Sequence, residues 1–161
     1  MAWKWPNDIV CDGRTVCGIL CETAVCGDTV ATVVGIGVNL TQTQEEFARA
    51  GLPYAASLYG LCGKAVDARS LADEIVRRLL PLAKQVFESG FAPLIGTYER
   101  GCVTLGKTVC VRDTDGTVRL QGTARAVATD GALLVTADTG EEIRCDAGEV
   151  SVRGLYGYYD A

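Results

Sequence analysis

A nearly unbroken apolar run constrains the fold most strongly, because Val30–Val38 contains only apolar residues and glycines apart from one threonine. A strand with one solvent-facing side would alternate apolar and polar residues, so this run predicts a strand covered on both faces. Two shorter runs, Ile9–Cys11 and Val16–Glu22, predict further strands before it. Turns are predicted between them at Asp12-Gly13 and Gly27-Asp28. We therefore expect the first forty or so residues to form the buried sheet of a larger layered domain.

The middle third of the chain has helical periodicity. Thr43 is a predicted N-cap for a short helix, and Asp67 is the predicted start of a longer one that ends at Gly90. Pro81 lies inside this longer helix and is expected to kink or break it. A further short helix is predicted around Phe91–Tyr98. The longer helix has one apolar stripe, which we expect to belong to the core: Leu71, Ile75, Leu79, Leu82 and Val86.

From about Val103 the pattern changes to short strands separated by regular turn signals. The turns are predicted at Asp115-Gly116, Asp130-Gly131 and Thr139-Gly140. Several short strands in about fifty residues favour a small barrel of SH3-like size. The change of period near Gly101 places the predicted domain boundary between residues 1–101 and 102–161. The whole chain is predicted to have an α+β fold, with a partial mixed β-sheet and packed helices followed by this barrel.

Charge and composition exclude several classes of protein. The 161 residues include 15 Lys and Arg against 20 Asp and Glu, for a net charge of −5. A nucleic-acid-binding face needs an excess of positive charge, so we expect no nucleic-acid partner. No apolar run is long enough to span a membrane, and the first residues lack the pattern of a secretory signal. We expect a cytoplasmic protein with no membrane partner.

Two residue counts narrow the possible chemistry. The chain has no histidine, which excludes Ser-His-Asp and Cys-His catalysis and zinc sites that use histidine. It has eight cysteines, but no two are separated by only two residues, so neither a zinc ribbon nor a thioredoxin-type pair is predicted. Most of the cysteines lie in apolar runs, which favours buried, reduced thiols over a redox or metal role.

Four sequence blocks, taken together, resemble the biotin protein ligase family. They are Lys4–Asp8, Gly18–Glu22, Val34–Leu40 and Gly148–Arg153, in the order and at about the spacing of that family. The resemblance covers essentially the whole chain. It implies the second half of a class II synthetase-like ligase domain, truncated, plus the family's small C-terminal domain.

The resemblance also implies roles for particular residues, several of which have independent physical support. Asn7 can both donate and accept hydrogen bonds, as an adenine edge or a ribose requires. Asp8 is a suitable carboxylate for Mg²⁺ that bridges phosphates, and it is implied to be catalytic together with Lys4. Further implied nucleotide contacts are Asn39, Glu149 and Arg153.

The implied biotin site lies on the strands of the apolar runs, where glycines would let a flat bicyclic ligand approach the backbone. Without the resemblance, these glycines are equally compatible with ordinary strand packing or a bulge. Likewise, Asn7 and Asp8 would fit a turn, and Glu149 with Arg153 a surface ion pair. The implied biotin contacts are Thr15, Gly18, Ile19, Leu20, Gly35, Ile36 and Gly37.

The reaction implied by the resemblance has two steps. Biotin and ATP form biotinyl-5′-adenylate with release of pyrophosphate, and a lysine of a biotin carboxyl-carrier domain then attacks the acyl carbon. The implied substrates are biotin and ATP with Mg²⁺, and the implied protein partner is the carrier domain. Such chemistry requires positioning and positive charge, and it does not require histidine.

Two departures from the family are expected to matter. The family's glycine/arginine-rich adenylate loop lies upstream of Lys4–Asp8 and is expected to be absent from this chain. The family also uses a lysine at the biotin carboxylate and α-phosphate, at the position of Thr15. Arg14 precedes it but would point to the opposite face of a regular strand. We therefore expect a truncated chain that does not ligate biotin alone and that forms a homo-oligomer through an exposed sheet edge.

Two alternative interpretations remain at this point. The chain could be a non-catalytic remnant of the ligase fold that retains ligand or protein binding. A lipoate protein ligase would share the fold, but it fits the Trp-Pro-Asn-Asp block and the C-terminal barrel less well.

Overall fold

The computed structural model describes residues 1–113, 117–146 and 150–153. Contacts within the chain divide it into two compact units. The first contains residues 7–66 together with Met1, and the second contains Ala2–Pro6 together with the chain from Asp67 onward. The predicted division into family domains at residue 101 stays a prediction.

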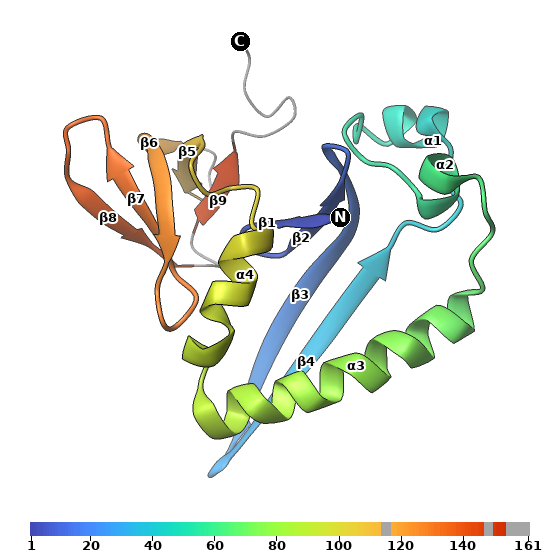
Figure 1. The fold of residues 1–161 in the computed structure, drawn as a ribbon, viewed down its shortest axis with the longest axis horizontal. Coiled ribbons are helices and arrows are strands. Elements are labelled where there is room, and N and C mark those ends of the chain that lie inside the picture. The colour runs from blue at the N-terminus through green and yellow to red at the C-terminus, as the bar shows by residue number, and fades with distance from the viewer. Residues whose placement is uncertain (114–116, 147–149, 154–161) are drawn as a thin grey trace. The chain divides into compact units, whose positions relative to one another are not determined.

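The first unit is built on an antiparallel sheet of β2 (Asp8–Cys11), β3 (Arg14–Cys26) and β4 (Thr29–Val38). Figure 1 shows β3 and β4 as one long hairpin. The predicted strands and turns are confirmed. Asp12 and Gly13 take positive φ values of 46° and 78°, and Gly27 takes 57°, as tight hairpin turns require.

The outer half of this hairpin is exposed on both faces, contrary to the prediction of a buried strand. Every residue from Leu20 to Gly35 is exposed, including Val25 at 71% and Val33 at 65%. Burial begins only near the base of the hairpin, where Val16 is 1% exposed. The apolar run correctly identified a strand, but its burial on both faces was predicted wrongly, because the described residues do not cover the outer half of the hairpin.

Two short helices complete the first unit. Helix α1 (Gln44–Arg49) begins at a capping box, in which Thr43 Oγ1 accepts from the Glu46 N–H and the Glu46 carboxylate accepts from the Thr43 N–H. This confirms the predicted cap. Helix α2 (Leu58–Cys62) was not predicted, although its N-cap Ser57 and its left-handed C-cap Gly63 are the usual sequence signals for such a helix.

In the second unit, α3 (Ala68–Ser89) begins at the predicted cap Asp67 and ends before Gly90. The sequence predicted a kink or a break at Pro81; the helix continues through this residue, so it is not broken there. A proline in a helix removes one backbone hydrogen bond, and the remaining 21 residues of α3 outweigh that local loss. No residue of α3 is fully buried, and Leu82 and Val86 of the predicted core stripe are 47% and 38% exposed.

The remaining elements of the second unit form a strand-rich domain preceded by short helices. They are β1 (Ala2–Lys4), the 3₁₀ helix η1 (Ala92–Leu94), α4 (Ile95–Gly101), β5 (Thr108–Asp113), β6 (Val118–Val127), β7 (Leu133–Ala137), β8 (Glu142–Cys145) and β9 (Val150–Arg153). The strands β5 to β9 pair antiparallel in the order β8-β7-β6-β5-β9. The described residues thus form an open sheet and not the closed barrel that the turn pattern predicted (Figure 1).

One face of this sheet is packed into a core. Strand β7 alternates buried and half-buried residues, and Leu133 and Val135 are completely buried. Trp5 packs against the same cluster at 2% exposure and donates its indole N–H to the Gly131 carbonyl at 2.9 Å. The α+β class is thereby confirmed, with an alternating, one-sided sheet as its best-packed part.

Two further expectations can be checked on the described residues. None of the eight cysteines, which all lie among the described residues, is in a disulfide. Four of them are buried, Cys17, Cys102, Cys110 and Cys145, so the expectation that most of the thiols are buried is met for half of them. None of the described helices is both long and apolar enough to cross a bilayer.

Candidate functional site

The pairing of β3 with β4 places the glycines of the predicted biotin site on one face. Gly18 lies opposite Gly37 and Leu20 lies opposite Gly35, and directly opposed residues share a face of an antiparallel pair. Asp8 of β2 lies opposite Gly18 and therefore joins the same face. We call the surface formed by Asp8, Gly18, Leu20, Gly35 and Gly37 the glycine face.

The glycine face is open for close approach by a ligand. A Cβ added to Gly35 or Gly37 would meet only the Leu20 and Gly18 carbonyl oxygens within 4 Å among the described residues, at 3.7 and 3.8 Å. A Cβ added to Gly18 would meet Asp8 Oδ1 at 3.8 Å. These are ordinary contact distances, so the glycines are not required by packing within the chain. Their lack of side chains leaves room over the backbone for a flat group.

A β-bulge at Val16 decides how the two residues before it are presented. Thr15 pairs with Val10 and therefore lies on the same face as Asp8, because Asp8 and Val10 are two residues apart on β2. Arg14 pairs with Cys11 and lies on the opposite face. The cation next to Thr15 in the sequence is thus directed away from the glycine face.

Arg14 contacts a different part of the first unit. Its Nη1 donates to Gln44 Oε1 at 3.3 Å. Together with Gln44, Phe47, Ser57 and Tyr59 it lines a pocket of 260 Å³ beside α1 and α2. The sequence motifs did not predict this pocket. Its walls come from α1, from the start of α2 and from the start of β3, which only the fold brings together.

The structure divides the predicted biotin contacts between the two faces. Ile19 and Ile36 lie opposite each other, one position along from the glycine pairs, and so point to the other side of the sheet. They cannot form the wall of a pocket on the glycine face. The grouping that the structure supports is the glycine face together with Thr15.

The two predicted asparagine contacts bond to backbone groups of the sheet. Asn7 Nδ2 donates to the Ile19 carbonyl at 2.7 Å, and Asn39 Nδ2 donates to the Thr15 carbonyl at 3.4 Å. The Asn39 backbone N–H also donates to the Val16 carbonyl at 2.9 Å. Both side chains therefore position the strands that carry the glycine face, and Asn39 holds the bulge.

Asp8 brings a carboxylate to the glycine face, with a consequence for a neighbouring thiol. Burial raises the pKa of Cys17, and the negative charge of Asp8 raises it further. The thiol therefore stays protonated near neutral pH and is a poor nucleophile. Among the described residues there is no cluster of three or more acidic or cysteine side chains that could hold a metal ion. Asp8 can supply one ligand to Mg²⁺ that arrives with a nucleotide, which is how this ion is commonly bound.

The remaining predicted residues fall in other parts of the chain. Lys4 lies in β1 of the second unit and is 9% exposed. Arg153 lies in β9, where its backbone is opposite Cys110. Glu149 lies outside the described residues. The roles implied for these three residues stay predictions.

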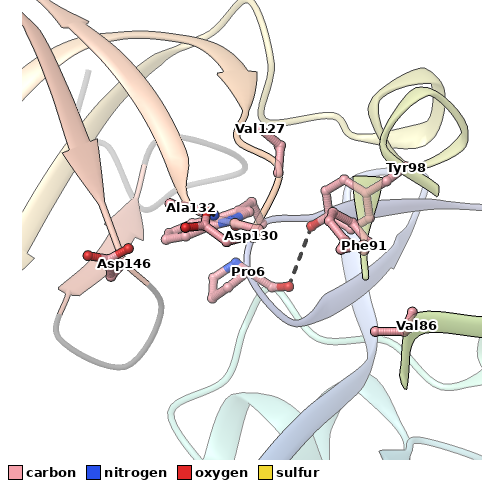
Figure 2. Close-up of a pocket in the computed structure, with 10 residues that line it drawn as sticks. Pro6, Val86, Phe91, Tyr98, Val127, Asp130, Ala132 and Asp146 are labelled. Carbon is pink, nitrogen blue, oxygen red and sulfur yellow. Dashed lines mark hydrogen bonds between the residues drawn. The ribbon is translucent and has the colours of Figure 1, made fainter. Parts of the chain in front are cut away.

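The second unit has a larger pocket of 530 Å³ that contains none of the predicted ligand contacts (Figure 2). Figure 2 shows Phe91 and Tyr98 on one side and Asp130 on the other, with the Tyr98 hydroxyl donating to the Pro6 carbonyl at 3.5 Å. Arg144 neutralises the acidic side, because it bonds to both Asp130 and Asp146. Burial raises the pKa of Tyr98, so its hydroxyl stays protonated.

The sequence of this chain is similar to those of known proteins. Residues 104–153 match the family described as the biotin protein ligase C terminal domain. The chain is 32% identical over 145 residues to the biotin–[acetyl-CoA-carboxylase] ligase of Paracoccus denitrificans, which covers 89% of this chain and 60% of that protein.

Solved structures give the same result. The crystal structure of biotin protein ligase from Aquifex aeolicus superimposes with a TM-score of 0.80 at 26% identity, covering 95% of this chain and 64% of that one. The same ligase in complex with biotin and ATP has a TM-score of 0.76 at 28% identity, covering 95% and 62%. The chain thus spans about three fifths of the length of these relatives. The resemblance predicted from its motifs is confirmed: in sequence and in fold, this chain is similar to biotin protein ligases over most of its length.

Proposed function

We propose that this chain carries the biotin- and nucleotide-binding sheet and the C-terminal domain of a biotin protein ligase. The observation that supports this most is the open glycine face with Asp8 at its edge, in a chain that superimposes on a ligase solved with biotin and ATP. The reaction is activation of biotin by ATP to biotinyl-5′-adenylate, followed by transfer to a lysine of a biotin carboxyl-carrier domain. The expected homo-oligomer and cytoplasmic location stay predictions.

In this proposal the strands mainly position the reactants. The ring of biotin lies over Gly18, Gly35 and Gly37, where no side chain intervenes. Asp8 faces the same side and provides an oxygen ligand for Mg²⁺ that accompanies the ATP phosphates. Holding the acyl carboxylate and the α-phosphate in a reactive arrangement accounts for much of the rate in such reactions.

The strands β2, β3 and β4 place no cation on the glycine face, although this chemistry favours one. Thr15 occupies the position where the family has a lysine, and Arg14 is directed to the opposite face. A hydroxyl does not stabilise charge that develops between a carboxylate and a phosphate as a cation does, and losing one such group typically lowers the rate by about 10² to 10³. We therefore propose that the 161-residue polypeptide has little or no ligase activity by itself.

A mass-spectrometric assay for biotinyl transfer to a carrier domain tests both parts. We expect little or no product with the unmodified chain and more product with Thr15→Lys, while Thr15→Gln, similar in length but neutral, gives no gain. A second assay adds the remaining part of a ligase catalytic domain in trans and is expected to restore turnover. Robust turnover by the unmodified 161 residues alone would contradict the proposed inactivity, and no product under any condition would contradict the ligase assignment.

A second candidate function is a non-catalytic module that binds a biotinyl or nucleotide ligand. The absence of a cation from the glycine-face side of β2, β3 and β4 favours it, since binding of a flat group does not require that charge. Retained binding of ligand in calorimetry, with no transfer even after addition in trans, would favour this alternative over the ligase.

A further inference from the structure

The pocket of the second unit is walled by segments that lie far apart in the sequence. Pro6 lies just after β1, and Asp130 lies between β6 and β7. Phe91 is the residue before η1, and Tyr98 lies in α4. All the described lining residues belong to the second unit. The volume of 530 Å³ lies within the range of small-molecule sites, so the pocket can hold a small organic ligand.

One wall of the pocket is aromatic and is held in place by its neighbours. Tyr98 stacks on Trp3 with ring centroids 5.8 Å apart, and Phe91 meets Tyr98 edge to face at the same separation. The Trp3 indole N–H also donates to the Tyr98 carbonyl. An apolar or aromatic group of a ligand can therefore pack against Phe91 and Tyr98 without rearranging them. The faces of such rings also attract a positive charge.

A long hydrogen bond beside this wall leaves a carbonyl oxygen available to a ligand. The Tyr98 hydroxyl donates to the Pro6 carbonyl at 3.5 Å (Figure 2). Bonds between two oxygens are usually about 2.7 to 2.8 Å long, so this one is weak. Because Trp3 and Phe91 hold the tyrosine ring, the hydroxyl stays at this distance. An N–H of a ligand can donate to the Pro6 carbonyl at a normal length, which the tyrosine does not reach.

The other side of the pocket carries more negative than positive charge. Asp130 and Asp146 both line it, and both accept from Nη2 of Arg144. One guanidinium balances only one of the two carboxylates, so this group of three side chains keeps one negative charge. The side chains of Asp130 and Asp146 are 56% and 54% exposed, which leaves their oxygens accessible. A carboxylate oxygen can accept more than one hydrogen bond, so a cation of a ligand can bind beside Arg144.

We propose that this pocket binds a small organic cation in which a short chain joins an aromatic ring to a primary ammonium group. The ring packs against Phe91 and Tyr98, and the ammonium group lies on the side of Pro6 and Asp130, as the two sides of the pocket in Figure 2 require. A neutral compound of the same shape loses the attraction to the carboxylates, and an anion is repelled by them. The pocket uses other residues than the glycine face, so the proposal does not depend on the proposed function.

Titration of the isotope-labelled 161-residue chain with three probes, followed by NMR at neutral pH and low salt, tests the proposal. The probes share a phenyl ring and a short chain: phenethylamine, phenethyl alcohol and phenylpropionate. Two resonances report on the pocket, because the Ala132 amide donates to Asp130 Oδ1 at 3.3 Å and the Trp5 indole N–H donates to the Gly131 carbonyl.

The amine is expected to shift both resonances in a saturable way and to bind at least about threefold more tightly than the alcohol, as for an exposed ion pair. Phenylpropionate is expected to bind more weakly than the alcohol. Because the attraction acts at exposed carboxylates, the ratio of the amine and alcohol affinities is expected to shrink as salt is raised. A preference that came from shape alone would not respond to salt.

Two substitutions are expected to change this ratio in opposite directions. Asp130→Asn removes the uncompensated charge, so the preference for the amine over the alcohol should disappear. Arg144→Gln leaves both carboxylates without their cation, so the preference should increase. A purely structural disturbance of the pocket would weaken the binding of both probes in both variants. Asp138→Asn is the matched control, because Asp138 is an exposed carboxylate of the same unit that does not line the pocket, and the ratio should stay unchanged.

Several outcomes would overturn the proposal. Equal affinities for the amine and the alcohol would do so, as would no binding of the amine. Binding that shifts resonances elsewhere, but neither the Ala132 amide nor the Trp5 indole, would place the amine on another surface. If Asp130→Asn did not fold, Arg144→Gln alone would decide, and an unchanged or smaller ratio there would overturn the proposal. The proposed function, which concerns the strands of the first unit, would stand in each of these cases.

Discussion

The two sheets of this protein, made from similar apolar residues, are buried to very different extents. In the sheet of β5 to β9, Val109, Val111 and Val135 are completely buried and join one core cluster. In the hairpin of β3 and β4, Val25 and Val33 have most of their side chains exposed. Both sheets pair antiparallel, without a register shift between β3 and β4 and with one shift each in the β5–β6 and β6–β7 pairings. Hydrogen-bonded pairing is therefore common to the two, and the coverage of their faces is what differs.

This difference shows that strand formation and strand burial are separate consequences of an apolar sequence. The C-terminal sheet has alternating residues, so one covered face is enough for it. The run in β4 is apolar at almost every position and requires cover on both faces, yet a two-stranded ribbon alone is only marginally stable in water. The apolar residues of the hairpin thus require more covering surface than the described residues provide. The chain spans about three fifths of the length of its relatives.

The largest difference between the sheets is expected at matched glycines. In Gly122→Ala the new Cβ would lie 2.3 Å from the Thr136 carbonyl oxygen, and since this atom is backbone the sheet itself must shift. We expect a loss of about 3 kcal/mol in the free energy of unfolding. In Gly37→Ala the new Cβ would lie 3.8 Å from the Gly18 carbonyl oxygen, and we expect almost no loss. Urea denaturation followed by circular dichroism measures both, and a comparable loss for the two variants would contradict the openness of the glycine face.

A smaller difference is expected at matched valines. Val135→Ala removes two fully buried methyl groups and should cost about 2 kcal/mol in the free energy of unfolding. Val33→Ala acts at a residue that is 65% exposed and should cost less than about 0.5 kcal/mol.

The unfolding of Val135→Ala is measured by tryptophan fluorescence during denaturation, because Trp3 and Trp5 both lie in the second unit. The unfolding of Val33→Ala is measured by circular dichroism and by hydrogen exchange of the hairpin amides. If Val33→Ala destabilised the protein as much as Val135→Ala, the hairpin would be covered in solution and the contrast between the sheets would not hold.

The smallest effect is expected from pH. Hydrogen bonds from Arg77, and then from Arg78, lower the pKa of Glu74 to about 2 in the second unit. In the first unit, the bond from the Thr43 backbone lowers the pKa of Glu46. A carboxyl with a lowered folded-state pKa stabilises the fold above its ordinary pKa of about 4, and this contribution is lost as pH falls toward the folded value.

The unfolding temperature is therefore expected to drift downward between about pH 4.5 and pH 2, by less than either substitution in the protein core causes. Glu74→Gln should flatten part of this drift as read by tryptophan fluorescence. An unfolding temperature that rose on acidification would show that the ion pairs of Glu74 with Arg77 and Arg78 do not stabilise α3.

Much of the local structure could be predicted from short-range signals. Thr43 and Asp67 were expected to cap helices and do so, because an N-cap bonds within its own first turn and needs no distant partner. The turns at Asp12-Gly13 and Gly27-Asp28 are equally local. Of the kink or break predicted at Pro81, the break does not occur, because the local preference of proline is outweighed by the rest of a 22-residue helix.

The sequence named candidate site residues, but not the faces of the sheet on which they lie. The motif named Gly18, Gly35 and Gly37 together with Ile19 and Ile36, and a sequence block cannot say which of these share a face once a bulge is present. The pairing with β2 and β4 separates the isoleucines from the glycines and places Thr15 with Asp8. Likewise, the motif suggested nucleotide contacts for Asn7 and Asn39, and the structure shows both bonded to strand backbone.

The sequence by itself determined the order of the elements and their caps and turns, since each of these depends on residues close together in the chain. The sequence also determined the resemblance to the biotin protein ligases and the presence of a threonine, not a lysine, at position 15. Only the tertiary structure decided that the bulge at Val16 directs Arg14 away from the glycine face and that the described C-terminal strands form an open sheet. It also decided that the outer half of the β3–β4 hairpin is exposed on both faces. These depend on which segments pair and which faces are covered. The physical reason is that the burial of a side chain, and the face of the sheet on which it lies, depend on contacts between distant segments. Helix capping and turn formation depend on neighbours in the chain.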